Sequence, residues 1–466
     1  MTDKISAPNV YLFAFQIHHD TKENNSLWHH CDNILAKFTD KNITPHLKFP
    51  PNSPYRVDLL PNVALKFNSN TNSLIEGIVQ PIQIQDSYAL FLNIGCPENE
   101  ATKNRDVSFI EKFNPENVLL IDGDDYFVGQ TLLVTGLLTD DTPRDDTTLK
   151  TLADNCRDAL FHGNSSPIFY RSGKLFGSQI FEYDLINDIA NYRHLLVWLF
   201  EDKQADKSFN ACQQEILDLL FYRNKIVKSF QDSRKIYHEL DREYRIIEKN
   251  MEILQQQFSR GTVLTSVQLQ EFQEQLKQLF SKAVTYTRLL RKLEDYDNTI
   301  ALNLNNYTDI LSKICDILGT DKEELSILNN FSIKIAPYMR SQIAGDLGYF
   351  RHGTNLIEQA IASIRGIVEI EQARSDRTNQ LALRKSEDKE KYRDDRLQST
   401  VQAIGVGLAA GGIAASSGTD KVFQTVQNHQ IPVLMQWHPF AFSFLLSCAI
   451  ALFLASITWW RTKPKK

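Results

Sequence analysis

The histidines and acidic residues near the amino terminus are the side chains whose types could support metal chemistry. The pair "HH" at 18–19 and the triplet "HHC" at 29–31 could supply ligands, but neither spacing matches a zinc module. The stretch "DGDDYFVG" at 122–129 lacks the alternating acidic positions and the closing glutamate of a calcium loop. We therefore expect a turn between two strands at 122–129 and no metal site at the histidines.

Catalytic motifs are absent from the sequence. It has no P-loop, no G-x-G-x-x-G, no G-x-S-x-G and no H-E-x-x-H. A net charge of −6 gives no broad basic surface of the kind that duplex nucleic acid demands. The six cysteines are scattered without paired spacing, which is typical of a reduced, cytosol-facing protein. We expect neither an enzyme nor a nucleic-acid partner.

Asp394 and Asp395 belong to a charge-dense stretch at 374–396, "RSDRTNQLALRKSEDKEKYRDDR", which is polar almost all round. One interpretation is a solvated stalk helix. In the other interpretation several copies of the chain pack around an axis, and the two carboxylates form a metal-attracting ring at a cytoplasmic entrance. The sequence leaves both interpretations open.

Two uncharged stretches follow. Residues 440–460, "FAFSFLLSCAIALFLASITWW", are long enough to cross a hydrocarbon core of about 30 Å as a helix, and the basic tail "RTKPKK" comes directly after them. Trp459 and Trp460 lie where membrane spans carry an aromatic belt. Residues 401–417 are rich in glycine, which is unfavourable in a water-exposed helix but allows close helix packing in a membrane. A glycine-rich linker is the alternative for 401–417.

Charge asymmetry predicts that both stretches span the membrane as a hairpin. The basic tail belongs in the cytoplasm by the positive-inside rule, and no signal peptide precedes the amino-terminal domain. Residues 384–396 carry six basic residues, whereas 418–439 carry only Lys421. We expect an integral protein of a bacterial cell membrane with both termini in the cytoplasm. The first span is only weakly hydrophobic, which suits a helix facing protein or a water-filled pore.

Heptad spacing predicts long coiled-coil helices upstream of the membrane. One seam covers 230–258, "SRGTVLTS" at 259–266 breaks it, and a second seam covers 272–318, so we expect an antiparallel hairpin. A third helix can begin at Pro337 and continue without a proline through the charged stretch into 401–417. Its seam comprises Ile343, Leu347, Phe350, Ile357, Ile361, Ile364 and Val368.

Short apolar runs separated by turn residues predict a mixed domain at the amino terminus. We expect an α+β or α/β domain at 1–185, a helical region at 186–336, a long stalk helix at 337–400 and the transmembrane hairpin at 401–466, with spans at 401–417 and 440–460. The expected strands are 9–17, 73–85, 88–95, 117–121 and 126–138, the expected helices are 25–38 and 149–161, and a hairpin at 167–183 is expected to turn at Ser172-Gly173.

This order of domains resembles the CorA-type divalent cation transporters, in which five subunits surround a pore lined by the first span. The family's Gly-Met-Asn signature at the outer end of that span is absent, and the region reads "SSGTDKVFQT" (416–425) instead. The resemblance implies a homopentamer, a divalent cation such as magnesium as the transported ion, and no other cofactor. It also implies that the first span lines the pore through Ser399, Gln402, Gly405, Ala409, Gly412, Ser416 and Ser417.

Two functions are therefore open. One is an oligomeric channel or transporter that moves cations across a lipid membrane under the control of the cytoplasmic domain. The other is a membrane-anchored ligand sensor or effector that oligomerises through coiled coils and transports nothing. The missing triplet favours the sensor, and the unbroken helix from stalk to first span favours the channel.

Overall fold

The computed structural model describes residues 3–18, 26–49, 56–97, 100, 103–140, 142–161, 166–184, 193–258, 265–417, 448–449, 452–454, 456–457 and 460. The chain divides into two compact units. The first comprises Met1–Gly261 and Leu276–Ile361, and the second comprises Thr262–Gln275 and Ala362–Lys466. The first unit contains the sheet and the helices packed against it, and it positions the candidate site.

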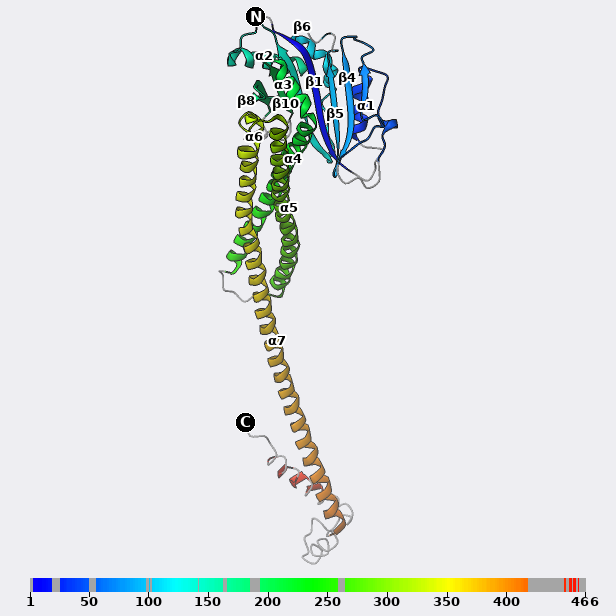
Figure 1. Ribbon diagram of the computed structural model, residues 1–466. Helices are drawn as coiled ribbons and strands as arrows, with labels where there is room; N and C mark the ends of the chain where they lie inside the picture. Colours follow the sequence, from blue (N-terminus) through cyan, green and yellow to red (C-terminus); the bar gives the residue numbers. More distant parts are fainter. Residues whose placement is uncertain are drawn as a thin grey trace, which may run out of the picture. The chain divides into compact units, whose positions relative to one another are not determined.

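One mixed sheet forms the amino-terminal part of the first unit (Figure 1). Its strands are β1 (Lys4–Ile17), β2 (Arg56–Asp58), β3 (Leu65–Asn68), β4 (Glu76–Ile84), β5 (Ser87–Gly95), β6 (Asn104–Asp106), β7 (Phe127–Leu138), β8 (Phe169–Leu175), β9 (Ser178–Tyr183) and β10 (His194–Phe200). The order is β2-β4-β5-β1-β7-β10-β9-β8, with β3 on β4 and β6 on β1. Among the described strands only β7 and β10 pair in parallel.

The central strand β1 is apolar on both faces because helices cover the sheet on both sides. Phe13 faces one core, and its neighbour Leu12 faces the other, as the alternation of side chains along a strand requires. The core around Leu12 is closed by α1 (Ser26–Ala36) and α2 (Asp146–Leu160). The core around Phe13 is closed by α3 (Lys203–Ala211) and α4 (Gln213–Phe258). The predicted mixed domain is thus confirmed as a three-layer arrangement.

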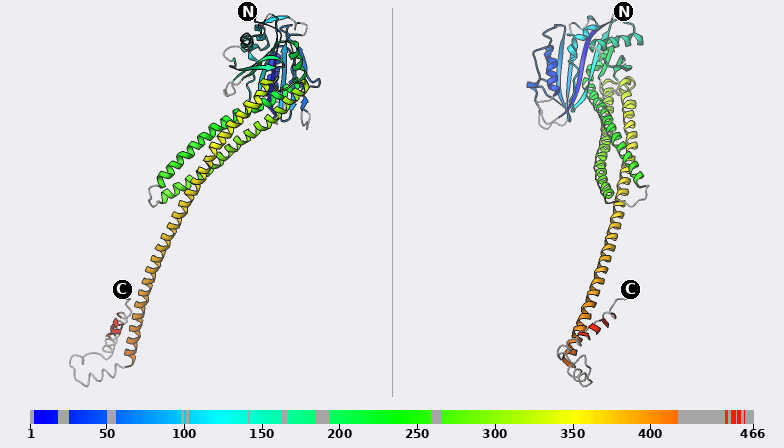
Figure 2. Two further views of the ribbon diagram at one scale, coloured as in Figure 1. Left: turned by 60° about the vertical axis from the view of Figure 1, so that its left-hand side comes forward. Right: turned by 180° about the vertical axis from the view of Figure 1, so that it is seen from behind.

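Three long helices form a bundle in the first unit. α4, α5 (Ser266–Leu318) and the first part of α7 (Ala336–Ser417) lie side by side, as Figure 1 and both views of Figure 2 show. The predicted seams are buried between them, for example at Leu240, Leu293 and Ile343. Arg340 of α7 makes two hydrogen bonds of 3.0 Å to the carboxylate of Asp297 on α5. The long helices predicted from heptad spacing are confirmed.

The third helix has the extent that the sequence predicts. A short helix α6 (Ser326–Asn330) and a π-helical turn η5 (Phe331–Ile335) lead directly into α7, which has Pro337 in its first turn and continues to Ser417. The charged stretch at 374–396 is helical and exposed. α7 therefore joins the bundle to the uncharged residues 401–417 without a break.

The expected strand at 117–121 is wrong. Its N–H groups bond within local turns and to side chains rather than to a neighbouring strand. The N–H of Leu119 donates to Asn114 Oδ1 at 2.9 Å, and the N–H of Ile121 donates to Gln130 Oε1 at 2.8 Å. These side chains satisfy the backbone in an irregular segment, which a pattern of apolar residues does not reveal.

The hairpin at 167–183 is confirmed, but its turn is not at Ser172-Gly173. β8 and β9 turn at Phe176-Gly177, where both residues have positive φ angles of 49° and 79°. Gly173 lies inside β8, where a Cβ would come within 3.2 Å of Ile327 Cβ on α6. That glycine marks a close approach of a helix rather than a turn.

The sheet extends beyond the boundary expected at residue 185, because β10 pairs with β7 and β9 at His194–Phe200. At the carboxyl terminus, no helix among the described residues is both long and apolar enough to cross a membrane. Residues 418–447 and most of the expected second span at 440–460 lie outside the described residues. The expected first span is helical to Ser417, but most of its side chains also lie outside them.

Candidate functional site

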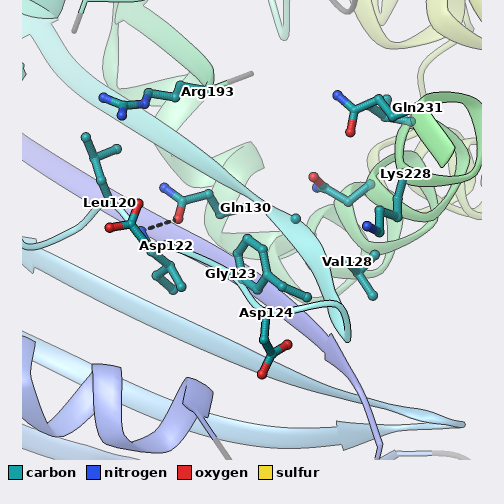
Figure 3. A pocket seen from close by; sticks show the side chains of 14 residues that line it. Leu120, Asp122, Gly123, Asp124, Val128, Gln130, Arg193, Lys228 and Gln231 are labelled. Atoms are coloured by element: carbon teal, nitrogen blue, oxygen red, sulfur yellow. Dashed lines mark hydrogen bonds between the residues drawn. The ribbon is translucent and has the colours of Figure 1, made fainter. Parts of the chain in front are cut away.

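A polar cavity of about 330 Å³ lies between β7 and α4 (Figure 3). Its walls are residues 120–124, residues 127–130 of β7, Arg193 just before β10, and one face of α4. The volume is within the range of small-molecule sites, which is about 300–1,000 Å³. The cavity can therefore hold a metabolite-sized ligand.

The α4 wall presents four side chains with helical spacing. Val227 and Lys228 lie three and four residues after Asn224, and Gln231 lies seven after it, so the four share one face of the helix. Figure 3 shows Lys228 and Gln231 extending from α4 toward the cavity, with Arg193, Leu120 and Asp122 on the other side. Polar groups thus face the cavity from both sides.

The loop wall is fixed by hydrogen bonds to the rest of the sheet domain. The carboxylate of Asp124 accepts hydrogen bonds from Gln16 Nε2 at 3.0 Å and from Ser26 Oγ at 2.8 Å. Gln130 accepts from the N–H of Ile121 and donates to the carbonyl of Leu119 at 3.2 Å. The stretch 122–129 is thus a turn followed by the start of β7, but the strand that we expected before the turn, at 117–121, is not formed. Side-chain hydrogen bonds hold this wall in place.

Asn224 connects the cavity to a buried hydrogen-bonded network. Its Nδ2 donates to Thr131 Oγ1 on β7 at 3.1 Å, and Thr131 Oγ1 lies 2.8 Å from His194 Nδ1 on β10. His194 Nε2 lies 3.2 Å from Glu182 Oε1 on β9. Because a carboxylate only accepts, Nε2 carries the ring proton, and Nδ1 accepts from the Thr131 hydroxyl. The donors therefore run in one direction, from Asn224 to Glu182.

Glu182 is a buried carboxylate held by two guanidinium groups. Arg171 Nε of β8 donates to its Oε2 at 2.6 Å, and Arg223 Nη2 of α4 donates to its Oε1 at 2.8 Å. Burial alone would raise the pKa of Glu182, but the hydrogen bond from His194 and the charges of Arg223 and Arg171 outweigh it and hold this pKa far below its usual range. The carboxylate is ionised at any physiological pH.

The network reaches the segment that leads into α7. Arg171 Nη2 donates to the carbonyl of Ile327 in α6 at 3.0 Å, and the guanidinium of Arg223 lies 5.1 Å from the ring centroid of Phe331 in η5. Glu182 and its partners therefore join the sheet, α4 and the approach to α7 in one buried cluster.

His194 is neutral in this cluster. Burial and the nearby Arg223 charge lower its pKa to about 4, although the hydrogen bond to Glu182 opposes that shift. The contact between His194 and Glu182 is thus a hydrogen bond from a neutral imidazole rather than an ion pair at pH 7.

The residues predicted as a pore or a metal ring all lie on α7. Asp394 and Asp395 are exposed neighbours, and Gln402 and Gly405 are exposed as well. The Ser399 hydroxyl donates to the carbonyl of Arg396 at 2.9 Å. The side chains of Ala409, Gly412, Ser416 and Ser417 lie outside the described residues. A ring or a pore requires further copies of the chain, so both stay predictions.

The described residues hold no group of three or more His, Cys, Asp or Glu side chains that could bind a metal ion. Two of the amino-terminal histidines have other neighbours. The ring of His18 lies 5.0 Å from that of Tyr88, and His30 Nε2 lies 2.9 Å from the carbonyl of Val118.

Sequence reasoning missed the cavity and the Glu182 network. One signal was present: the sequence "LDLLFYRNKIV" (217–227) places Arg223 and Asn224 inside a predominantly apolar helical stretch. Charged or amide side chains at such positions are buried only with partners, so they indicate a polar network across the core.

The fold and the cavity define a class of protein, namely a mixed-sheet domain built onto a bundle of long helices, with a ligand-sized cavity where the two meet. No protein-family model matches the chain, and neither the curated proteins nor the solved structures contain a match to it. Its function is therefore argued from its own residues.

Proposed function

We propose that the protein is a membrane-anchored sensor whose sheet domain binds a small polar ligand in the cavity and transmits binding to α7. The observation that carries this proposal is the position of Asn224. Its side chain lines the cavity and also donates the hydrogen bond that begins the buried network. A ligand that moves Asn224 acts directly on that network.

The far end of the network supports transmission to the stalk. Arg171 and Arg223 contact α6 and η5, which lead into α7 without an intervening loop. A ligand shifts an equilibrium only through different contacts in the two states, and here the cavity and the network share α4. Rearrangement of α4 would change the contact of Arg223 with η5, and with it the packing of the first turns of α7.

The carboxyl-terminal sequence supports the membrane anchor. The uncharged residues 440–460 and the basic tail after them have the composition of a span with a cytoplasmic flank. The seams are buried within one chain, so the long exposed part of α7 is the part available for self-association into a homo-oligomer. In this function the hairpin at 401–460 anchors the oligomer.

Hydrogen exchange on the full-length protein in detergent tests the sensor. We expect the small-molecule fraction of a bacterial lysate to protect amides at 120–130 and 224–231, and also at the remote 326–350. Thr131→Val interrupts the network outside the cavity lining and should abolish only the remote protection, whereas the control Thr131→Ser keeps the hydroxyl and should preserve it. Protection confined to the cavity in the wild-type protein would contradict transmission.

A cation channel is the second candidate, and the unbroken α7 favours it. A single helix from the bundle to Ser417 could carry a movement of the sheet domain to a pore, as the resemblance to CorA-type transporters implies. Magnesium flux into liposomes containing the full-length protein tests this function. Asp394→Asn should reduce flux, whereas the control Asp376→Asn, farther from 401–417 on the same exposed stretch, should not. Absence of magnesium flux would contradict the channel and leave the sensor as the proposed function.

A further inference from the structure

Gln231 leaves a buried hydrogen-bond donor without a partner at the α4 wall of the cavity. Its Nε2 is buried and has no hydrogen bond to any described residue. A buried donor without an acceptor costs about 1–3 kcal/mol, so native proteins rarely keep one without a reason. A ligand acceptor that enters the cavity would satisfy this amide once the Gln231 side chain turns its Nε2 toward the cavity.

Lys228 lies one helical turn from Gln231 and supplies a positive charge to the same wall. Its side chain is 25% exposed, and its Nζ lies 3.3 Å from Asp232 Oδ1. Lys235 binds the same oxygen more closely, at 2.9 Å, from outside the cavity. Asp232 is therefore shared, and the charge of Lys228 is only partly compensated.

The two carboxylates that line the cavity, Asp122 and Asp124, do not lie on the α4 wall. Asp124 already accepts hydrogen bonds from Gln16, Ser26 and the N–H of Tyr126. Asp122 is exposed, and Figure 3 shows it on the opposite side of the cavity from Lys228. An acceptor with negative charge is the group that this wall fits.

We infer that the α4 wall binds the carboxylate or phosphoryl group of a small organic anion, through Lys228 Nζ and Gln231 Nε2. Phe127, Val128 and Val227 also line the cavity and can pack against the apolar part of such a ligand. Charge-assisted hydrogen bonds of this kind are about twice as strong as neutral ones. The inference rests on the proposed ligand-binding function and names the class of ligand.

Thermal unfolding of the full-length protein in detergent tests the inference, with succinate and glycerol 3-phosphate as probes at constant ionic strength. We expect at least one of them to raise the melting temperature saturably, and glycerol to have no effect. The probe that acts identifies a carboxylate or a phosphoryl group. Lys228→Met should weaken the apparent affinity about tenfold or more, and Gln231→Leu should weaken it as well.

Lys235→Met is the matched control, because it removes the same charge from the same helix and from the same partner, Asp232, outside the cavity. Its affinity should fall by much less than that of Lys228→Met, because Asp232 then compensates Lys228 more fully but the ammonium group remains in the cavity. Failure of both probes, or equal losses in Lys228→Met and Lys235→Met, would overturn the inference. If neutral or cationic metabolites instead protect the cavity amides from hydrogen exchange, the inference of an anionic ligand is wrong, but the proposed sensor function stands. If the anion binds without remote protection, the anion site stands and the sensor fails.

Discussion

Tyr286 of α5 lies across Gly353 of α7 so closely that a Cβ atom at Gly353 would be 2.3 Å from the tyrosine hydroxyl oxygen. The hydroxyl donates to the carbonyl of Phe350 at 2.7 Å, one turn earlier on α7. The ring also packs near Tyr244 of α4, whose Cδ2 would be 2.9 Å from the same Cβ. All three long helices therefore meet at this glycine.

Gly353→Ala should destabilise the protein by about 1–3 kcal/mol, because the added methyl group displaces Tyr286 from a packed position. Gly348→Ala is the control: its Cβ would meet nothing within 4 Å on the same helix. Since alanine is the better helix former, that change should be neutral or stabilising by up to about 1 kcal/mol. Chemical denaturation measures both changes. Equal stabilities would contradict the packing described at Gly353.

Glu182→Gln should cost about 3–5 kcal/mol, because it removes the charge that compensates the buried guanidinium of Arg223 and the partly buried one of Arg171. The control is Glu116→Gln. Glu116 pairs with Lys37 at 2.7 Å, but its side chain is 79% exposed, so solvent screens this pair and it contributes little to stability. Denaturant unfolding compares the two variants. A loss of similar size in both variants would show that the Glu182 carboxylate does not compensate the guanidinium charges as described.

Stability should fall as the pH drops from about 6.5 to about 4, because of His194. The pKa of His194 is about 4 in the folded protein, against an ordinary value of 6.5. Between these pH values the unfolded chain binds a proton at this histidine and the folded chain does not. This linkage removes about 2 kcal/mol between pH 7 and pH 5. The pKa of Glu182 is also lowered, so its contribution is present above its ordinary pKa of 4.5 and is lost below that pH.

Unfolding of the wild-type protein and of His194→Gln at pH 7 and pH 5 measures this effect. The variant lacks the titrating imidazole, so its stability should depend less on pH over this interval. The other histidines titrate in both proteins and cancel in the comparison. The same pH dependence in both would exclude His194 as the cause.

Cysteine labelling tests the predicted membrane hairpin. Lys421→Cys and Lys466→Cys, each introduced into a chain with its native cysteines replaced by serine, should react with a membrane-impermeant reagent from opposite sides of the membrane. Labelling of both positions from the same side would contradict the hairpin. Extraction of the chain by carbonate would also contradict an integral membrane protein.

The sequence predicts the long helices well because their signal is periodic and repeated. Leu240, Leu293 and Ile343 lie on heptad seams that many neighbouring residues support, so one misjudged residue does not change the prediction. The strands β1, β4, β5 and β7 are predicted for a similar reason, since each is a run of apolar residues bounded by turn residues.

The cavity could not be predicted because its walls come from distant parts of the chain. Residues 120–124, Arg193 and α4 meet only after β7 and β10 have paired in parallel, and no local pattern specifies that pairing. The expected strand at 117–121 fails for the same reason. Its hydrogen bonds go to Asn114 and Gln130, whose roles depend on tertiary structure.

The buried Glu182 cluster has a consequence for evolution by gene fusion. A fragment that ends before α4 would lose Arg223 and the apolar face of α4, leaving Glu182 without one of its two guanidinium partners and part of the sheet's apolar surface exposed to water. The sheet domain is therefore not an interchangeable module that recombination could attach to another stalk. The sheet domain, α4 and the first part of α7 must be inherited together, as one piece of about the extent of the first unit.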